Sequence, residues 1–253
     1  MINIIKKMIS KLKNKFRYTK IHYLLLSFFN KQYVKWIDDE VKFHKLFLKN
    51  QKLIFDIGAN RGDKTHIFCQ FSKKVISFEP EEQMYEILKN RFRKNKKVGL
   101  RKLVISDKKG VVDFLSVKNK QAYSSIIKKS ILNIDEDNLK IENKRKLSST
   151  LNLQIKKNGR PDYIKIDCEG AELLIVKNLG YNIKIISLES NLPQFYFETI
   201  KIIKLMKQKF NSKFNIRINN KFKFSFKENV SDKKIMNFLK QKKLVCEVFI
   251  FND

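Results

Sequence analysis

The stretch LIFDIGANRGDKTHIF, residues 53–68, decides how this chain folds. An apolar run of strand length ends in Asp56, and a segment with helical spacing follows. Gly58 lets the backbone turn tightly, and Asn60 tolerates the left-handed conformation better than most side chains. Gly62 allows the following helix to pack closely. We expect a strand, a tight turn and a helix, with a ligand against the helix N-terminus.

The same alternation continues along the chain. Four more runs have strand length and β-branched or aromatic content: KVISFEP (74–80), LRKLVISD (100–107), YIKIDCEG (163–170) and IKIISLES (183–190). Segments with helical period, 64–71 and 82–95, separate the first three strands. Strands that alternate with helices predict an α/β fold with a doubly wound, mostly parallel, Rossmann-like sheet.

The remaining segments are less regular. We expect VVDFLSV (111–117) to form an added strand, and the charged segment 128–146 is typical of a surface insertion with a helix. FNIRI (214–218) and FKFSF (222–226) flank a hairpin-like junction. A helix over 232–242 then precedes an antiparallel closing strand, CEVFIF (246–251).

Length and hydropathy predict two parts, a basic helical extension over residues 1–50 and one domain over 51–253. One face of the extension is an apolar stripe formed by Ile4, Ile5, Met8, Ile9, Leu12 and Phe16. Residues 1–30 could lie on an anionic membrane surface, or the helix could pack on the domain or on a second copy. No run is long enough to span a membrane and no secretory signal is visible, so we expect a cytoplasmic protein, with peripheral membrane contact left open.

The charge and the cysteines limit the classes of function. A net charge of +30 suits binding to nucleic acid, but lysine far outnumbers arginine and is spread from end to end, which favours a solvated surface. Cys69, Cys168 and Cys246 lie far apart, so we expect neither disulfides nor a zinc site.

Polar residues at the ends of the first three strands predict a nucleoside site. Asp56 would repel a pyrophosphate but suits the ammonium group of an amino-acid moiety. Glu79 lies 21 positions after Gly58, where a carboxylate accepts hydrogen bonds from ribose hydroxyls. Ser106 and Asp107 either contact the adenine or cap the turn before Gly110.

The fourth strand carries IKIDCEGAE, residues 164–172. Lys165, Asp167 and Glu169 alternate with apolar neighbours, so they share one face. Three charges in a central strand either pair with one another or emerge into the crevice at the strand ends. Glu172 would begin the next helix.

These motifs resemble the FkbM family of methyltransferases over residues 53–190. The matching elements, in order, are DIGANRG (56–62), FEP (78–80), SDKKG (106–110), Ser124-Ser125, Thr150-Leu151, IKIDCEGAE (164–172) and ISLES (186–190). Asn152 departs from the acid that often follows Thr-Leu in the family, which puts an acidic role there in doubt.

The resemblance implies S-adenosylmethionine as cofactor and methyl transfer to a hydroxyl oxygen of a sugar, glycan or secondary metabolite. Asp167 is the first candidate to orient or deprotonate the acceptor, followed by Glu169 and Glu189. A divalent metal held by Asp167 and Glu189 fits these side chains, but no spacing demands one.

Two other classes of function stay open. A nucleic-acid methyltransferase would suit the charge, and NLPQF (191–195) resembles the Asn-Leu-Pro-aromatic element of adenine methyltransferases. That element belongs after the fourth strand, beside a flipped base, whereas here it follows the fifth. The third class is a binding protein that keeps the fold without turnover. The sequence names neither the acceptor nor the oligomeric state.

Overall fold

The computed structural model describes residues 31–117, 124–127, 140–219, 221–240 and 242–252. The apolar stripe of the N-terminal extension and residues 128–139 of the expected insertion lie outside these ranges. Cys69, Cys168 and Cys246 are free cysteines in the structure.

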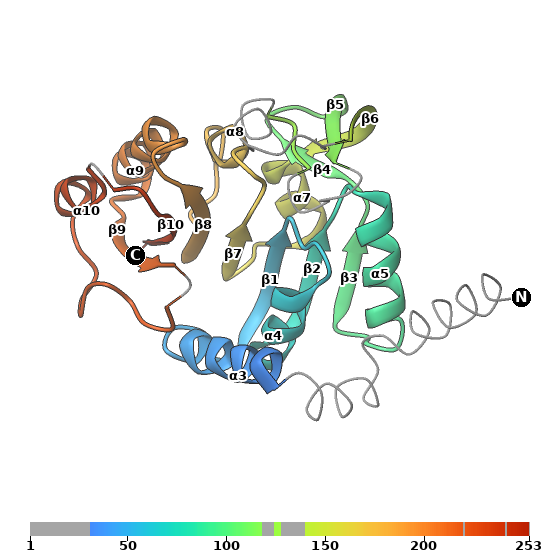
Figure 1. Ribbon diagram of the computed structural model, residues 1–253, viewed down its shortest axis with the longest axis horizontal. Coiled ribbons are helices and arrows are strands. Elements are labelled where there is room, and N and C mark those ends of the chain that lie inside the picture. The colour runs from blue at the N-terminus through green and yellow to red at the C-terminus, as the bar shows by residue number, and fades with distance from the viewer. Residues whose placement is uncertain (1–30, 118–123, 128–139, 220, 241, 253) are drawn as a thin grey trace, which may run out of the picture.

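A seven-stranded sheet forms the centre of the fold (Figure 1). Its strands, in spatial order, are β3 (Val98–Arg101), β2 (Ser72–Phe78), β1 (Gln51–Ile57), β7 (Tyr163–Ile166), β8 (Ile185–Asn191), β10 (Val245–Phe251) and β9 (Lys213–Ile218). The first five pair in parallel, and β10 is antiparallel to both of its neighbours. The predicted mostly parallel sheet and its antiparallel closing strand are confirmed.

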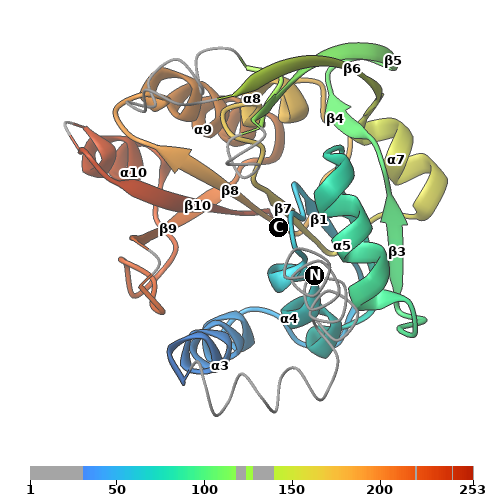
Figure 2. The same ribbon diagram turned by 45° about the vertical axis from the view of Figure 1, so that its right-hand side comes forward.

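Helices cover both faces of this sheet (Figure 2). They are α3 (Lys31–Lys45), α4 (Asp63–Phe71), α5 (Glu82–Phe92), α7 (Leu151–Asn158), α8 (Glu172–Val176), α9 (Tyr196–Phe210) and α10 (Asp232–Leu239). Side chains alternate across β1, so Ile54 packs in the core beneath α3 and α4, while Phe55 packs in the core of the opposite face. Among the described helices, none has the length and apolar content to cross a membrane.

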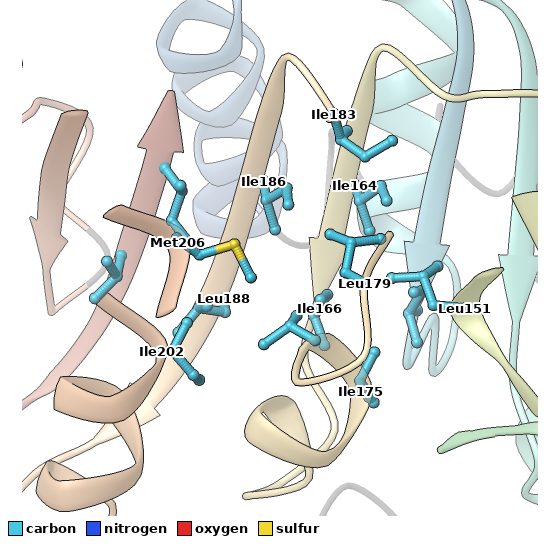
Figure 3. Close-up of a cluster of buried hydrophobic side chains, with 14 of the residues drawn as sticks. Leu151, Ile164, Ile166, Ile175, Leu179, Ile183, Ile186, Leu188, Ile202 and Met206 are labelled. Atoms are coloured by element: carbon cyan, nitrogen blue, oxygen red, sulfur yellow. The ribbon is translucent and has the colours of Figure 1, made fainter. Parts of the chain in front are cut away.

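The larger core lies between the sheet and helices α7 to α10. Figure 3 shows its centre, where side chains of β7 and β8 meet those of α7, α8 and α9; the labelled residues are Leu151, Ile164, Ile166, Ile175, Leu179, Ile183, Ile186, Leu188, Ile202 and Met206. Burying one such side chain contributes roughly 1.5 to 3 kcal/mol. This packing fixes the strand ends of β7 and β8, where the polar residues of the fourth-strand motif lie.

The expectation of one strand over residues 100–107 is wrong. The run divides into β3, which ends at Arg101, and β4 (Val104–Ser106), which joins a second sheet in the order β4-β6-β5. The last ladder bond of β3 is donated by the amide of Glu79 to the carbonyl of Arg101, at 3.0 Å. The next amide that would donate to this side, that of Glu81, bonds instead to Glu79 Oε1 at 2.8 Å, so the ladder ends here.

Two further expectations need correction. The second sheet contains β5 (Gly110–Val117), as predicted, but its partner β6 (Ile141–Thr150) covers residues 141–146, where a helical insertion was expected. Residues 222–226 form no strand, and β9 pairs with β10 instead of making a hairpin. Instead, the ring of Phe224 in this segment packs against Phe43 of α3 and Phe249 of β10.

A buried charge cluster fastens α3 to the sheet. The guanidinium of Arg217 on β9 donates to both oxygens of Glu40, at 2.9 and 3.1 Å, and its Nε lies 3.3 Å from Glu247 Oε2. Lys64 Nζ on α4 lies 2.5 Å from Glu40 Oε2. Burial alone would raise the pKa of Glu40, but the charges of Lys64 and Arg217 reverse this and lower it to about 2.

We predict that Arg217→Met lowers the free energy of unfolding by roughly 3 to 5 kcal/mol, because it leaves the carboxylates of Glu40 and Glu247 short of their shared cation in the interior. Urea unfolding followed by circular dichroism measures this. Lys42→Met, which removes an exposed ion pair with Asp39, is the control and should change the free energy far less. Equal effects of the two variants would contradict the prediction.

Candidate active site

A pocket opens where β1, β2 and β7 end. Its empty volume, including the open mouth, is about 690 Å³, within the usual range of small-molecule sites. One part of the lining is apolar and comes largely from α5 and the second sheet: Met84, Leu103, Val104, Ile105 and Phe114. The other part follows the strand ends and is polar: Gly58, Asn60, Glu79, Asp167, Cys168 and Glu169. Five residues assigned from the sequence to the cofactor loop, the ribose contact and the acceptor therefore share this pocket: Gly58, Asn60, Glu79, Asp167 and Glu169.

Backbone geometry explains the glycine loop after β1. Gly58 has a φ of +79°, and a Cβ there would lie 1.8 Å from the carbonyl oxygen of Asp167. Asn60 has a φ of +50°, which confirms the expected left-handed conformation. Gly62, with a φ of +79°, leaves room for Leu88 and Phe92 of α5. The two glycines therefore each allow a close approach that a side chain would block.

Glu79 lies at the tip of β2 and is buried. Its two oxygens accept the amides of Asn60 at 2.7 Å and of Glu81 at 2.8 Å. Burial raises the pKa of Glu79 to about 7, even though the two amide hydrogen bonds act in the opposite direction. Each carboxylate oxygen can accept a further hydrogen bond, so this group can receive two hydroxyls from the pocket.

The end of β7 brings Lys165, Asp167 and Glu169 together. Lys165 is buried, and its Nζ lies 2.7 Å from Asp167 Oδ2. The side chain of Asp167 is 28% exposed, against 6% for that of Lys165, so Asp167 is the member of the pair that reaches the pocket. The sequence left open whether the charges pair with one another or emerge into the crevice. Asp167 does both, because it pairs with Lys165 and also lines the pocket.

Two glutamates near Asp167 have raised pKa values. For Glu189 on β8, repulsion by Asp167 and then burial raise the pKa to about 8. For Glu169, burial and then repulsion by Asp167 and Glu189 raise the pKa to about 9. Both glutamates are therefore mostly protonated at neutral pH and can donate hydrogen bonds. Glu169 lines the pocket, whereas Glu189 is not among the lining residues.

Four residues assigned to the cofactor from the sequence lie outside the pocket lining: Gly62, which packs against α5, and Asp56, Ser106 and Asp107. Asp56 is fully buried on the α4 side of the sheet, where it accepts a hydrogen bond from the Thr65 hydroxyl at 2.5 Å. Ser106 is buried and donates to the carbonyl of Lys108. Asp107 pairs with Lys177, with its Oδ2 2.7 Å from the lysine Nζ. Asp56, Ser106 and Asp107 thus have partners within the protein in place of a pocket ligand.

The family model for the FkbM methyltransferase domain matches residues 56–242. This chain belongs to the FkbM methyltransferase family. No curated protein matches the sequence. The match extends well beyond residues 53–190, to which the sequence motifs limited the resemblance.

Solved structures resemble the chain at low identity. A methyltransferase FkbM from Methylobacillus flagellatus KT is 11% identical with a TM-score of 0.49, over 81% of this chain and 44% of that one. A precorrin-6Y C5,15-methyltransferase from Geobacter metallireducens GS-15 is 11% identical with a TM-score of 0.47, over 85% and 87%. An O-methyltransferase from Bacillus cereus, in complex with SAH, is 10% identical with a TM-score of 0.47, over 85% and 80%. The family assignment depends on the domain match.

In this FkbM domain, three supporting residues were missed as contributors to the site. The hydroxyl of Ser125 donates to the carbonyl of Glu169 at 2.9 Å, and Glu172 accepts the amide of Cys168 at 2.9 Å. The ring of Phe195 fills the space beside Gly170, where a Cβ would lie 2.4 Å from it. The motif order contained Ser125 and Glu172, but only the fold shows that they hold the turn after β7.

Metal binding has no support in the described part of the chain. No group of three or more His, Cys, Asp or Glu side chains there is arranged to hold an ion.

We predict that the protein loses stability as pH rises from about 4.5 to about 9. Folding raises the pKa of Glu172 to about 7 and those of Glu189 and Glu169 to about 8 and 9, so the folded state holds more protons than the unfolded chain in this window. Glu189→Gln should flatten the fall between pH 6 and 9, measured by urea unfolding. Glu86→Gln on the exposed face of α5 is the control. Identical slopes in both variants would contradict the assignment.

Proposed function

We propose that this chain is an S-adenosylmethionine-dependent methyltransferase that methylates a hydroxyl oxygen of a sugar, glycan or secondary metabolite. The observation that carries the proposal is that Asp167 faces the same pocket as Gly58 and Glu79. An acid suited to a hydroxyl acceptor thus lies next to a loop and a carboxylate suited to a nucleoside.

The lining residues fit the cofactor. The apolar part, which includes Met84, Ile105 and Phe114, suits an adenine ring, and Glu79 is placed to accept hydrogen bonds from ribose hydroxyls. Asn60 and Glu169 belong to the polar part, which suits the amino-acid end. When bound, the cofactor supplies a methyl group that its sulfonium already activates.

The residues at the end of β7 fit the acceptor. Asp167 can accept the hydrogen bond of a hydroxyl and draw its proton away as the new bond to carbon forms. Lys165 fixes the orientation of that carboxylate through the 2.7 Å contact. The protonated carboxyl of Glu169, which lines the pocket, can donate a hydrogen bond to a further hydroxyl of a polyol. This combination favours a hydroxyl-rich acceptor.

The net charge of +30 favours a second candidate, methylation of a nucleic acid. Cofactor with a labelled methyl group distinguishes the two when it is incubated with neutral glycans and with ribosomal RNA. Label that enters RNA alone would refute the proposed acceptor class.

The proposed cofactor site predicts an effect of Glu79 on cofactor binding. Glu79→Ala should weaken S-adenosylmethionine binding by roughly 1.5 to 3 kcal/mol, about 10- to 150-fold, because two ribose hydrogen bonds to a carboxylate are lost. Isothermal calorimetry measures the affinity, and Glu79→Gln tests whether charge is needed. Glu82→Ala, an exposed change three residues further along, is the control. Unchanged affinity in Glu79→Ala would remove this residue from the site.

The proposed acceptor contact predicts an effect of Asp167 on turnover. Asp167→Asn should lower turnover by roughly 10²- to 10⁴-fold, because its interaction with the acceptor is realised mainly in the transition state. Cofactor affinity should fall much less. Melting temperature, cofactor affinity and turnover are measured on the same variant. A stable variant that binds cofactor and keeps wild-type turnover would move the catalytic role to Glu169 and Glu189.

A further inference from the structure

The pocket has an apolar end and an acidic end. Strand order places β1 between β2 and β7, so Glu79 and Asp167 extend from strands that are not neighbours. If the adenine occupies the apolar lining and the ribose meets Glu79, the remainder of the cofactor extends toward Asp167 and Glu169. This part carries the sulfur atom, which is cationic in S-adenosylmethionine and neutral in the demethylated product.

Asp167 carries negative charge into that end of the pocket. Its carboxylate is the largest cause that raises the pKa of Glu189, and it also raises that of Glu169. Since both glutamates are mostly protonated near neutral pH, they add little negative charge themselves. The field at this end therefore comes mainly from Asp167, although Lys165 is 2.7 Å away.

Lys165 and Asp167 form an ion pair, but Lys165 is much more deeply buried than Asp167. Lys165 is held in the sheet between Asp56 on β1 and Ser187 on β8, and its side chain is 6% exposed. Burial alone would lower the pKa of Lys165, but Asp167, Asp56 and Glu247 together raise it above its ordinary value. The lysine thus stays charged beneath the pocket, where it moderates the field of the more exposed Asp167.

We propose that Asp167 recognises the positive charge of the sulfonium, so that the site holds the methyl donor in preference to its neutral product. Lys165 acts through Asp167 as a positioning residue that limits this preference. The inference rests on the proposed function but concerns discrimination between two forms of the cofactor. It gives the acid a second role, in product release, besides its contact with the acceptor hydroxyl.

Calorimetry with S-adenosylmethionine and S-adenosylhomocysteine at pH 7.5 tests the inference without an acceptor. Asp167→Asn should weaken binding of the cationic ligand by about fivefold or more, since it removes a charge that attracts the sulfonium in a partly buried site. Binding of the neutral ligand should stay within about twofold. Lys165→Met should move the ratio of the two affinities the other way, because it leaves the negative charge of Asp167 uncompensated.

Asp107→Asn is a matched control. Asp107 has a lysine partner at the same distance, 2.7 Å, and a side chain that is 30% exposed against 28% for Asp167, but it is not among the pocket-lining residues. Its ratio of affinities should equal that of the wild type. An equal shift in Asp107→Asn would show a general charge effect and overturn the inference.

The remaining outcomes are also decisive. If Asp167→Asn and Lys165→Met weaken both ligands alike, the pair acts only on structure and the inference is wrong. If Asp167→Asn does not fold, Lys165→Met/Asp167→Asn removes the unpaired ammonium as well, and it should still show the lower ratio. A wild-type protein that binds neither ligand refutes the proposed function itself, whereas binding of both with an unchanged ratio in Asp167→Asn refutes the inference alone.

Discussion

The contact between the turn after β1 and the turn after β7 governs the whole site. A single methyl group at position 58 would lie 1.8 Å from the carbonyl oxygen of Asp167, so the two turns can meet only where one of them has no side chain. Because the two turns meet here, the glycine loop after β1 lies directly beside the acidic residues at the end of β7. Any larger residue would push the acid away from the loop that defines the pocket.

The spacing of apolar residues and the residue types in the turns were sufficient to predict most of the sheet. The alternation of apolar strands with helical segments identified β1, β2, β7 and β8, and the left-handed conformation of Asn60 followed from its residue type. The division of residues 100–107 was missed, although Arg101 and Lys102 interrupt the apolar run where β3 ends. The break accompanies a contact that only the fold shows, in which the amide of Glu81 bonds to the side chain of Glu79 and does not extend the ladder to β3.

The site itself was predictable where a residue follows a strand, and much less so where it lies within one. Glu79, Asp167 and Glu169 come after the last paired residue of their strands and line the pocket. Asp56 still lies within β1, so the alternation of side chains along the strand sets the direction of its carboxylate, which contacts Thr65 on α4. The apolar wall was not predicted because it comes from the second sheet, whose partner strands β5 and β6 are separated by 23 residues in the sequence.

The cluster around Arg217 joins parts of the chain that lie inside and outside the family-matched residues. The family-matched residues 56–242 contain Arg217 and Lys64, but they contain neither Glu40 nor Glu247, the two carboxylates that neutralise these cations. The charge cluster therefore extends beyond the family-matched residues on both sides. During synthesis residue 247 must emerge before both carboxylates can meet Arg217, so α3 gains its full set of charged partners only once β10 has been made.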